Sequence, residues 1–368
     1  MNIMDNKRKG NKPVSKAKKT TYHEQLEIDY TLKLREVMLT MPSFCREFFR
    51  AMETTTTAKT RISYVYDIRL FFYFLIETNP LYKNYETSDF QLNDLERITA
   101  IDIEEFAEYL KVYVNSYGKQ CKNSVRGIHR KLSSLRSFYA YYYKKQMINS
   151  NPTLLVDMPK LRDKEIVRLD ADEVAELLDL VEKGGDNLSG MKKVYYEKNK
   201  SRNLALFTLM LGTGIRVSEC VGIDINDIDF KNNRIRIIRK GQKEDYVYFG
   251  DEVETALLGY LKDRGGVSAV SGHEDALFLS IQRKRMSIQA IENLVNEYAG
   301  RITTFKHITP HKLRSTYGTN LYRQTGDIYL VAEVLGHNDV NTTRKHYAAL
   351  DEDIKRSAAN AVSLRKPN

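Results

Sequence analysis

Apolar residues in the first part of the chain recur at helical intervals. Between positions 61 and 77 they lie three or four residues apart, which predicts a helix with one apolar face. These residues are Val65, Ile68, Phe72, Leu75 and Ile76. A second helix is expected from Asp102, which has capping-box spacing to Glu105, and a third over 123–147. The pattern predicts a helical domain over residues 25–155.

A change in pattern follows this domain. Asn151-Pro152 ends the third helix, and residues 156–169 show neither helical nor strand periodicity, which predicts an extended linker. Asp170 and Glu173 then predict the capping box of a new helix. The segment 184–201 is interpreted as a polar insertion, and 202–211 as an apolar helix.

Alternating apolar and polar residues appear once in the second half. Residues 234–249 (RIRIIRKGQKEDYVYF) predict two strands around a turn at 240–243, and helical patterns dominate from Asp251 onward. The expected fold is therefore mainly α with a small antiparallel β-sheet. A second domain is expected over 170–368, ending in a C-terminal helix.

Composition narrows the class of protein. The 368 residues are 42% hydrophobic and 29% charged, as in ordinary soluble proteins, and they contain no apolar run long enough to span a membrane. Cys45, Cys121 and Cys220 lie far apart in helix-like patterns, which favours buried reduced thiols and a cytoplasmic location.

The charge of the chain points to a polyanionic partner. The formal net charge is +10, and seven Lys or Arg lie in the first twenty residues, so residues 1–24 are interpreted as a flexible basic arm. The third predicted helix carries Arg126, His129, Arg130 and Arg136, whose basic face could follow a phosphate backbone. A solvated charged face on a core helix is the alternative.

Four short segments hold candidate chemistry: GTGIRVSE (212–219), RKGQKE (239–244), HKLR (311–314) and LGHNDVNTTRKHY (335–347). Arg216 and Glu219 can share one helix face, either as a structural ion pair or with the arginine as an anion clamp. His311 and Arg314 repeat this spacing after Pro310, which is expected to open a helix.

Together, these side chains suit attack on a phosphodiester. Two guanidinium groups match the charge and geometry of the non-bridging oxygens. The hydroxyl of Tyr347 has an ordinary pKa of about 10, so nearby cations or a base must activate it. Lys240, at the tip of the predicted hairpin, could protonate the departing 5′ oxygen.

In the order and spacing of these motifs, residues 25–360 resemble the tyrosine recombinases, or phage-integrase family. The resemblance implies that Arg216 and Arg314 hold the scissile phosphate, that Lys240 is the general acid, and that Tyr347 forms a 3′-phosphotyrosyl link. It also gives His311 and His337 a role in proton transfer or phosphate binding, and makes Glu219 a supporting residue. The interval from His337 to Tyr347 is ten residues, one longer than the spacing commonest in the family.

The resemblance also implies an architecture and partners. A helical core-binding (SAM-like) domain and a mixed α/β catalytic domain would form a clamp on double-stranded DNA carrying a specific site. The segment 351–364 could be a helix that joins a homotetramer, or one that folds back on its own domain. No membrane partner is expected, and neither a nucleotide-binding loop nor a metal-ligand motif is present, so the implied chemistry needs no cofactor.

The predicted function is a site-specific recombinase that cleaves and rejoins DNA. Its N-terminal features resemble Xer-type enzymes that act alone in chromosome dimer resolution, in support of chromosome partition and cell division. An integrase of a phage or conjugative element uses the same active site and stays an alternative. Two further alternatives are a type IB topoisomerase-like relaxing enzyme and a catalytically silent DNA-binding protein.

Overall fold

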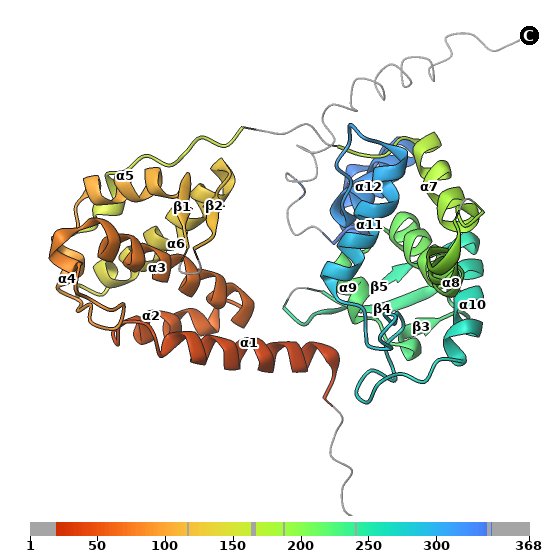
Figure 1. Cartoon of the computed structure of the whole chain (residues 1–368), viewed down its shortest axis with the longest axis horizontal. Coiled ribbons are helices and arrows are strands. Elements are labelled where there is room, and N and C mark those ends of the chain that lie inside the picture. The colour runs from red at the N-terminus through yellow and green to blue at the C-terminus, as the bar shows by residue number, and fades with distance from the viewer. Residues whose placement is uncertain are drawn as a thin grey trace, which may run out of the picture. The chain divides into compact units, whose positions relative to one another are not determined.

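The chain forms two compact units, Met1–Arg162 and Asp163–Asn368, in a computed structural model (Figure 1). The structure describes residues 20–115, 118–162, 167–186, 188–239, 241–336 and 340. The division between the units falls within the predicted linker, 156–169. The described residues are mainly helical with small antiparallel sheets, which confirms the predicted fold class.

The first unit consists of helices and one short hairpin. Its α-helices are α1 (Tyr22–Met38), α2 (Cys45–Ala51), α3 (Ala58–Thr78), α4 (Asp94–Arg97), α5 (Ala100–Tyr109) and α6 (Val125–Lys144). Its 3₁₀ turns are η1 (Met52–Thr54), η2 (Pro80–Tyr82) and η3 (Pro152–Leu154), and its strands are β1 (Val112–Val114) and β2 (Gln120–Lys122).

Two local predictions for this unit are wrong. The helix expected from Asp102 begins at Ala100, because Thr99 is the N-cap and Asp102 accepts its backbone N–H at 2.7 Å. Cys121 lies in strand β2 and not in a helix. Both errors arise from short segments, in which one capping residue or one hairpin outweighs the local periodicity.

Buried aromatic rings make up much of the core of the first unit. Phe72 of α3 and Phe138 of α6 are fully buried and meet edge to face, which joins the two longest helices of the unit. Asp67 is also buried between these helices and accepts hydrogen bonds from Arg130 and Ser134. A buried carboxylate needs such donors, since an unpaired charge in the core is costly.

The second unit packs helices around a three-stranded sheet. Its α-helices are α7 (Ala171–Lys183), α8 (Gly190–Thr213), α9 (Val217–Gly222), α10 (Asp251–Gly265), α11 (Ile288–Ile302), α12 (Pro310–Thr325) and α13 (Ile328–Val334). The 3₁₀ turn η4 spans Ile225–Asp227, and the strands are β3 (Ile228–Asp229), β4 (Arg234–Ile238) and β5 (Glu244–Tyr248). The strand order is β3-β4-β5, all antiparallel, with Ile235 opposite Val247.

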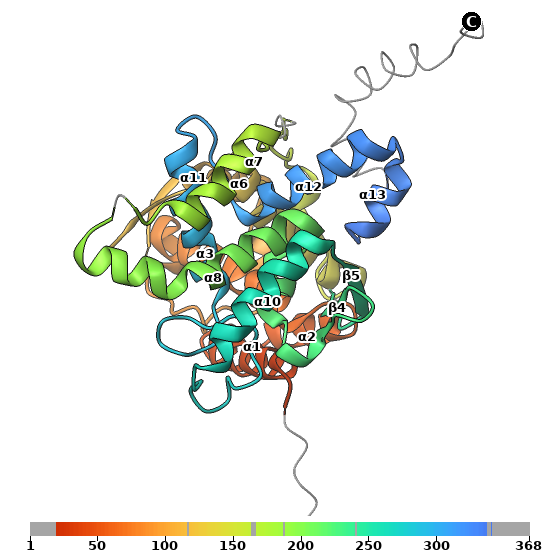
Figure 2. The same cartoon turned by 90° about the vertical axis from the view of Figure 1, so that its right-hand side faces the viewer.

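Most of the helix starts predicted in this unit are confirmed. Asp170 and Glu173 form the capping box of α7, and Pro310 opens α12. The insertion predicted over 184–201 is wrong in part, because α8 begins at Gly190 and runs to Thr213. Its first half is polar because it is largely exposed, whereas its second half is buried beside α10 (Figure 2).

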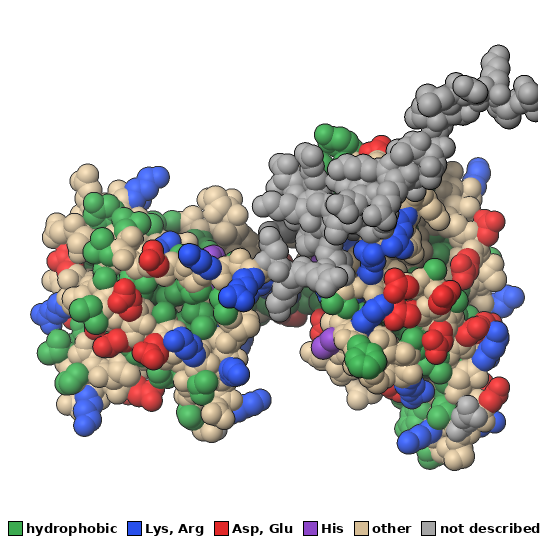
Figure 3. Space-filling model, turned by 90° about the horizontal axis from the view of Figure 1, so that it is seen from above, with side chains coloured by type: hydrophobic (Ala, Val, Ile, Leu, Met, Phe, Trp, Pro, Cys, Tyr) green, Lys and Arg blue, Asp and Glu red, His purple; other side chains and the backbone are tan. Residues whose placement is uncertain are grey.

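Charged side chains of both signs cover the surface. Basic and acidic groups are interspersed on the visible face of each unit (Figure 3). Much of the net charge of +10 comes from the first twenty residues, which hold seven Lys or Arg and one Asp. Among the described helices, none is both long enough and apolar enough to cross a membrane.

Candidate active site

Arg216 lies at the start of α9, where it forms an ion pair with Glu219. The Glu219 carboxylate accepts the backbone N–H of Arg216 at 2.9 Å and its guanidinium Nη1 at 2.8 Å. The Glu219 side chain is 3% exposed and that of Arg216 is 36% exposed. The predicted ion pair is therefore present, and the guanidinium it orients is still open to solvent.

Arg314 lies on α12, one turn after its start, and is 4% exposed. Its Nη1 donates to the carbonyl oxygen of Gly214 at 2.7 Å, and its Nη2 donates to that of Leu335. Gly214 ends α8 with a φ of 61°, and a Cβ there would lie 2.5 Å from the ring of Tyr317. The GTG segment thus ends α8 in a left-handed conformation that only glycine adopts readily in so small a space.

Arg239 is a third arginine of the cluster, and the sequence analysis did not identify it. Its side chain is 10% exposed and makes an ion pair with Asp245. Its Nη1 and Nη2 donate to the carbonyl oxygens of Leu335 and Val334 at 3.2 and 3.3 Å. The alternation of the strand could have identified it. Ile235 and Ile237 face the core, and position 239 continues the same face of the strand.

The three arginines converge on the C-terminal turn of α13. The carbonyl oxygen of Val334 accepts a hydrogen bond from Arg239, and that of Leu335 accepts from both Arg239 and Arg314. The next carbonyl oxygen, of Gly336, accepts from Arg216. These carbonyls have no partner within the helix and carry the negative end of its dipole, so guanidinium donors stabilise them. The helix packs against α12, which carries Arg314 (Figure 2).

The structure brings together only some of the predicted site residues. Arg216, Glu219 and Arg314 meet around the α13 turn, and His311 lies exposed on α12, one turn before Arg314. Lys240, His337 and Tyr347 lie outside the described residues, as does the predicted helix 351–364. In the sequence, Lys240 follows Arg239 and His337 follows Gly336, so two predicted site residues adjoin the cluster directly.

The predicted DNA-binding residues of α6 have different surroundings. Arg126 is exposed, and His129 is partly exposed. Arg130 pairs with the buried Asp67, and Arg136 donates to the carbonyl oxygens of Thr153 and Val156. Arg130 and Arg136 thus have structural partners, and the role of all four residues in DNA binding stays a prediction.

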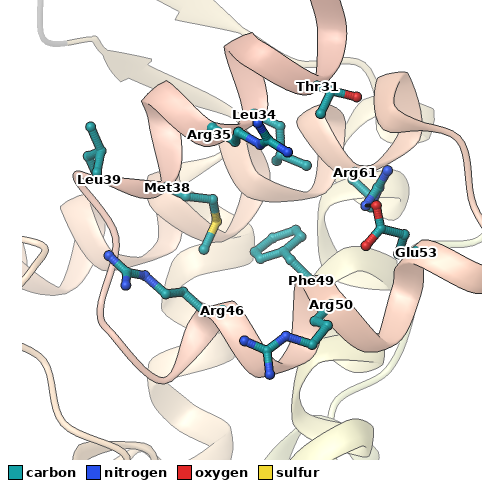
Figure 4. Close-up of a pocket in the computed structure, with 10 residues that line it drawn as sticks. All are labelled: Thr31, Leu34, Arg35, Met38, Leu39, Arg46, Phe49, Arg50, Glu53 and Arg61. Carbon is teal, nitrogen blue, oxygen red and sulfur yellow. Dashed lines mark ion pairs between the residues drawn. The ribbon is translucent and has the colours of Figure 1, made fainter. Parts of the chain in front are cut away.

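A separate pocket lies in the first unit, between α1, α2 and α3 (Figure 4). Its volume is about 490 Å³, and its lining combines Leu34, Met38 and Phe49 with four arginines. One of these, Arg61, pairs with Glu53 at 3.0 Å. The pocket contains none of the predicted site residues, so the candidate chemistry belongs to the arginine cluster of the second unit.

Comparison with known proteins identifies the family. Residues 167–353 match the model of the phage integrase family, and this span includes every predicted catalytic position. A tyrosine recombinase XerC of Caldanaerobacter subterraneus subsp. tengcongensis is 31% identical over 91% of this chain and 92% of its own length. The chain belongs to the phage integrase family of tyrosine recombinases.

Two further similarities concern the type of recombinase and its fold. Tyrosine recombinase XerS of Streptococcus uberis is 29% identical over 88% of this chain and 96% of its own length. A crystal structure of the XerH site-specific recombinase, bound to its difH substrate before cleavage, is similar in fold. It covers 85% of this chain and 81% of its own, with a TM-score of 0.58 and 21% identity. The chain is thus a site-specific tyrosine recombinase of the Xer type, an enzyme that cleaves and rejoins DNA strands.

Proposed function

We propose that Arg216 and Arg314 hold a phosphate of double-stranded DNA while the hydroxyl of Tyr347 attacks its phosphorus. The observation that carries this proposal is the convergence of both arginines on the turn that leads into His337. Among the described residues, the Arg216 guanidinium donates to Glu219 and Gly336, which uses two of its five N–H groups. The others can bind non-bridging oxygens.

The proposed reaction exchanges one ester for another. A bond forms between Tyr347 Oη and phosphorus as the bond from phosphorus to the 5′ oxygen breaks, and Lys240 gives that oxygen a proton. His311 and His337 take up the tyrosine proton or help to hold the phosphate. A 5′ hydroxyl of the partner strand then attacks the 3′-phosphotyrosyl link and releases the tyrosine. The energy of the phosphodiester is conserved, so resealing needs no ATP.

The arginines contribute most where the negative charge increases. In a site with little water, guanidinium groups that are already positioned stabilise the transition state more than mobile cations do. Loss of one such donor typically slows a reaction by about 100- to 1,000-fold. We expect Arg216→Ala and Arg314→Ala each to lose cleavage to this extent and to remain folded.

The biological role we propose is chromosome dimer resolution in the cytoplasm, by a homotetramer assembled on paired sites. Similarity to XerC and XerS over about nine tenths of the chain supports this role. Contacts through segment 351–364 would couple the active sites of the tetramer. The exposed Arg126 and His129 of α6 would contact the DNA backbone, with Arg130 and Arg136 contributing beside their structural partners.

Trapping the protein on genomic DNA tests both the proposed cleavage chemistry and the proposed biological role. Nicked DNA fragments let the 5′ product diffuse away, so each cleavage leaves protein covalently attached, and sequencing identifies the attached DNA. Attachment at one chromosomal site near the replication terminus would support dimer resolution, whereas attachment at the ends of a mobile element would support an integrase. Cleavage with no sequence preference would contradict site-specific recombination and support a relaxing enzyme.

A further inference from the structure

The guanidinium of Arg239 contacts three separate elements of the second unit. Its Nε pairs with Asp245 on the neighbouring strand β5. Its Nη1 donates to Leu335 and lies 3.8 Å from Glu219 Oε1, and its Nη2 donates to Val334. One side chain therefore joins the β4–β5 hairpin to α9 and to the end of α13.

The fit between Arg239 and the α13 turn is close. Gly336 has a φ of 59°, and a Cβ at that position would lie 2.1 Å from Arg239 Nη1 and 2.4 Å from Cζ. Such contacts cannot form without displacement of the guanidinium or the turn. The absence of a side chain at Gly336 thus lets Arg239 lie directly against the backbone that precedes His337.

The hairpin side of the contact is also well anchored. The backbone N–H of Arg239 donates to the carbonyl oxygen of Lys243 at 2.8 Å and closes the hairpin at the base of its tip. Lys240 is the first residue of this tip. Because consecutive Cα atoms are about 3.8 Å apart, the anchor at residue 239 limits where residue 240 can lie.

We infer that Arg239 is a positioning residue that docks the hairpin onto the α13 turn and so sets where Lys240 meets the departing 5′ oxygen. This inference rests on the proposed function, since it concerns the proton donor of that reaction. The planar fork of arginine is needed because its partners lie in different directions, and a lysine ammonium is a single point of charge. Asp245 and Glu219 supply the negative charge beside it.

Two DNA substrates can distinguish a role of Arg239 in positioning the proton donor from its other possible roles. One is ordinary nicked DNA containing the cognate site. The other carries sulfur in place of the bridging 5′ oxygen at the scissile position, and a thiolate leaves without a proton. A misplacement of about 1 Å can cost about 100-fold in rate, so we expect Arg239→Ala to cleave the oxygen substrate about 100-fold more slowly than wild type. It should cleave the sulfur substrate within about threefold of wild type, because that reaction does not need the general acid.

Matched variants complete the design. Arg236→Ala removes the same charge three residues earlier, in strand β4. Arg236 is 47% exposed and pairs with Asp227 and Glu244 on the surface, so this variant should cleave both substrates at the wild-type rate. Gly336→Ala should displace the Arg239 guanidinium and, like Arg239→Ala, slow cleavage of the oxygen substrate but not of the sulfur substrate. Circular dichroism and thermal melting confirm that each variant is folded. If Arg239→Ala does not fold, Gly336→Ala and Arg239→Lys provide the same comparison.

Several outcomes would overturn the inference. Wild-type cleavage of the oxygen substrate by Arg239→Ala would show that the contact is not needed. Equal losses on the two substrates would mean that Arg239 acts on the phosphate, the nucleophile or the fold, and not on the proton donor. If the wild-type protein forms no covalent adduct with either substrate, the proposed function itself fails, which is a different result.

Discussion

The ion pair between Arg216 and Glu219 yields a prediction about stability as well as activity. The Glu219 carboxylate is 3% exposed, accepts two bonds from Arg216 and lies 3.8 Å from Arg239. In Glu219→Gln, an amide N–H₂ replaces one carboxylate oxygen and faces a donor, and the two guanidinium groups lose their shared counter-ion. The change therefore removes the carboxylate with which Arg216 pairs and leaves Arg239 with Asp245.

The structure sets the size of this effect. Removing one member of a buried ion pair costs about 3–5 kcal/mol, and because Arg216 is partly exposed we expect a reduced loss of about 2–3 kcal/mol for Glu219→Gln. In a unit of about 200 residues, a loss of about 1 kcal/mol lowers the melting temperature by about 2–4 °C. The expected decrease is therefore about 4–12 °C.

A double-mutant cycle measures the pair itself. Urea unfolding of wild type, Glu219→Gln, Arg216→Met and the double variant should give a coupling energy of about 1–2 kcal/mol, since contacting charged partners are not additive. The exposed pair of Arg236 and Glu244 is the matched control, and its coupling should stay below about 1 kcal/mol. A coupling near zero for Arg216 and Glu219, with Glu219→Gln as stable as wild type, would refute the assignment of Glu219 as the counter-ion of the site.

Three further predictions have simple measurements. Tyr347→Phe should bind cognate DNA in gel-shift assays but form no adduct that survives denaturation, and such an adduct would exclude Tyr347 as the nucleophile. Burial raises the pKa of the Cys45 and Cys220 thiols, so native protein should react with iodoacetamide at the partly exposed Cys121 first, as peptide mass mapping can show. Burial alone would raise the pKa of Asp245, but hydrogen bonds from the Tyr246 backbone and from Arg239 hold it below its ordinary value. The Asp245 carboxylate therefore contributes fully to folding stability above about pH 4, and this contribution is lost as the pH falls through the lower pKa of the folded state. Asp245→Asn should accordingly show a smaller loss of stability at acid pH than wild type.

Local rules account for the parts of the site that could be predicted from sequence. Asp170 with Glu173 and Pro310 mark helix starts that depend on neighbouring residues only. The alternation over 234–249 is likewise local, and the structure has two strands there with a turn between them. The spacing of Arg216 and Glu219 gave the ion pair as one of two interpretations, and the structure has it because Arg216 is the N-cap of α9, three residues before Glu219.

Contacts between distant segments could not be predicted in the same way. Arg239 meets residues 334 and 335, almost a hundred positions later, and strand alternation indicates only that its side chain turns inward, not what it contacts there. The first half of α8, from Gly190, was missed because it is largely exposed and its few apolar residues do not form a regular helical stripe. The pairing of Arg130 with the buried Asp67, 63 residues earlier, could not be predicted from the spacing of basic residues along α6 either.

The carbonyls around the α13 turn explain how three arginines can lie together before DNA arrives. Guanidinium groups repel one another, and a cluster of them is stable only when negative charge or oriented dipoles surround it. Here Glu219 and Asp245 contribute two carboxylates, and Val334, Leu335 and Gly336 contribute carbonyl oxygens at the negative end of a helix. In the proposed reaction, a bound phosphate adds full negative charge beside these partial charges, so its binding should strengthen an arrangement that already exists. The three guanidinium groups are thus already held in place in the folded chain, as the proposed electrostatic stabilisation of the transition state requires.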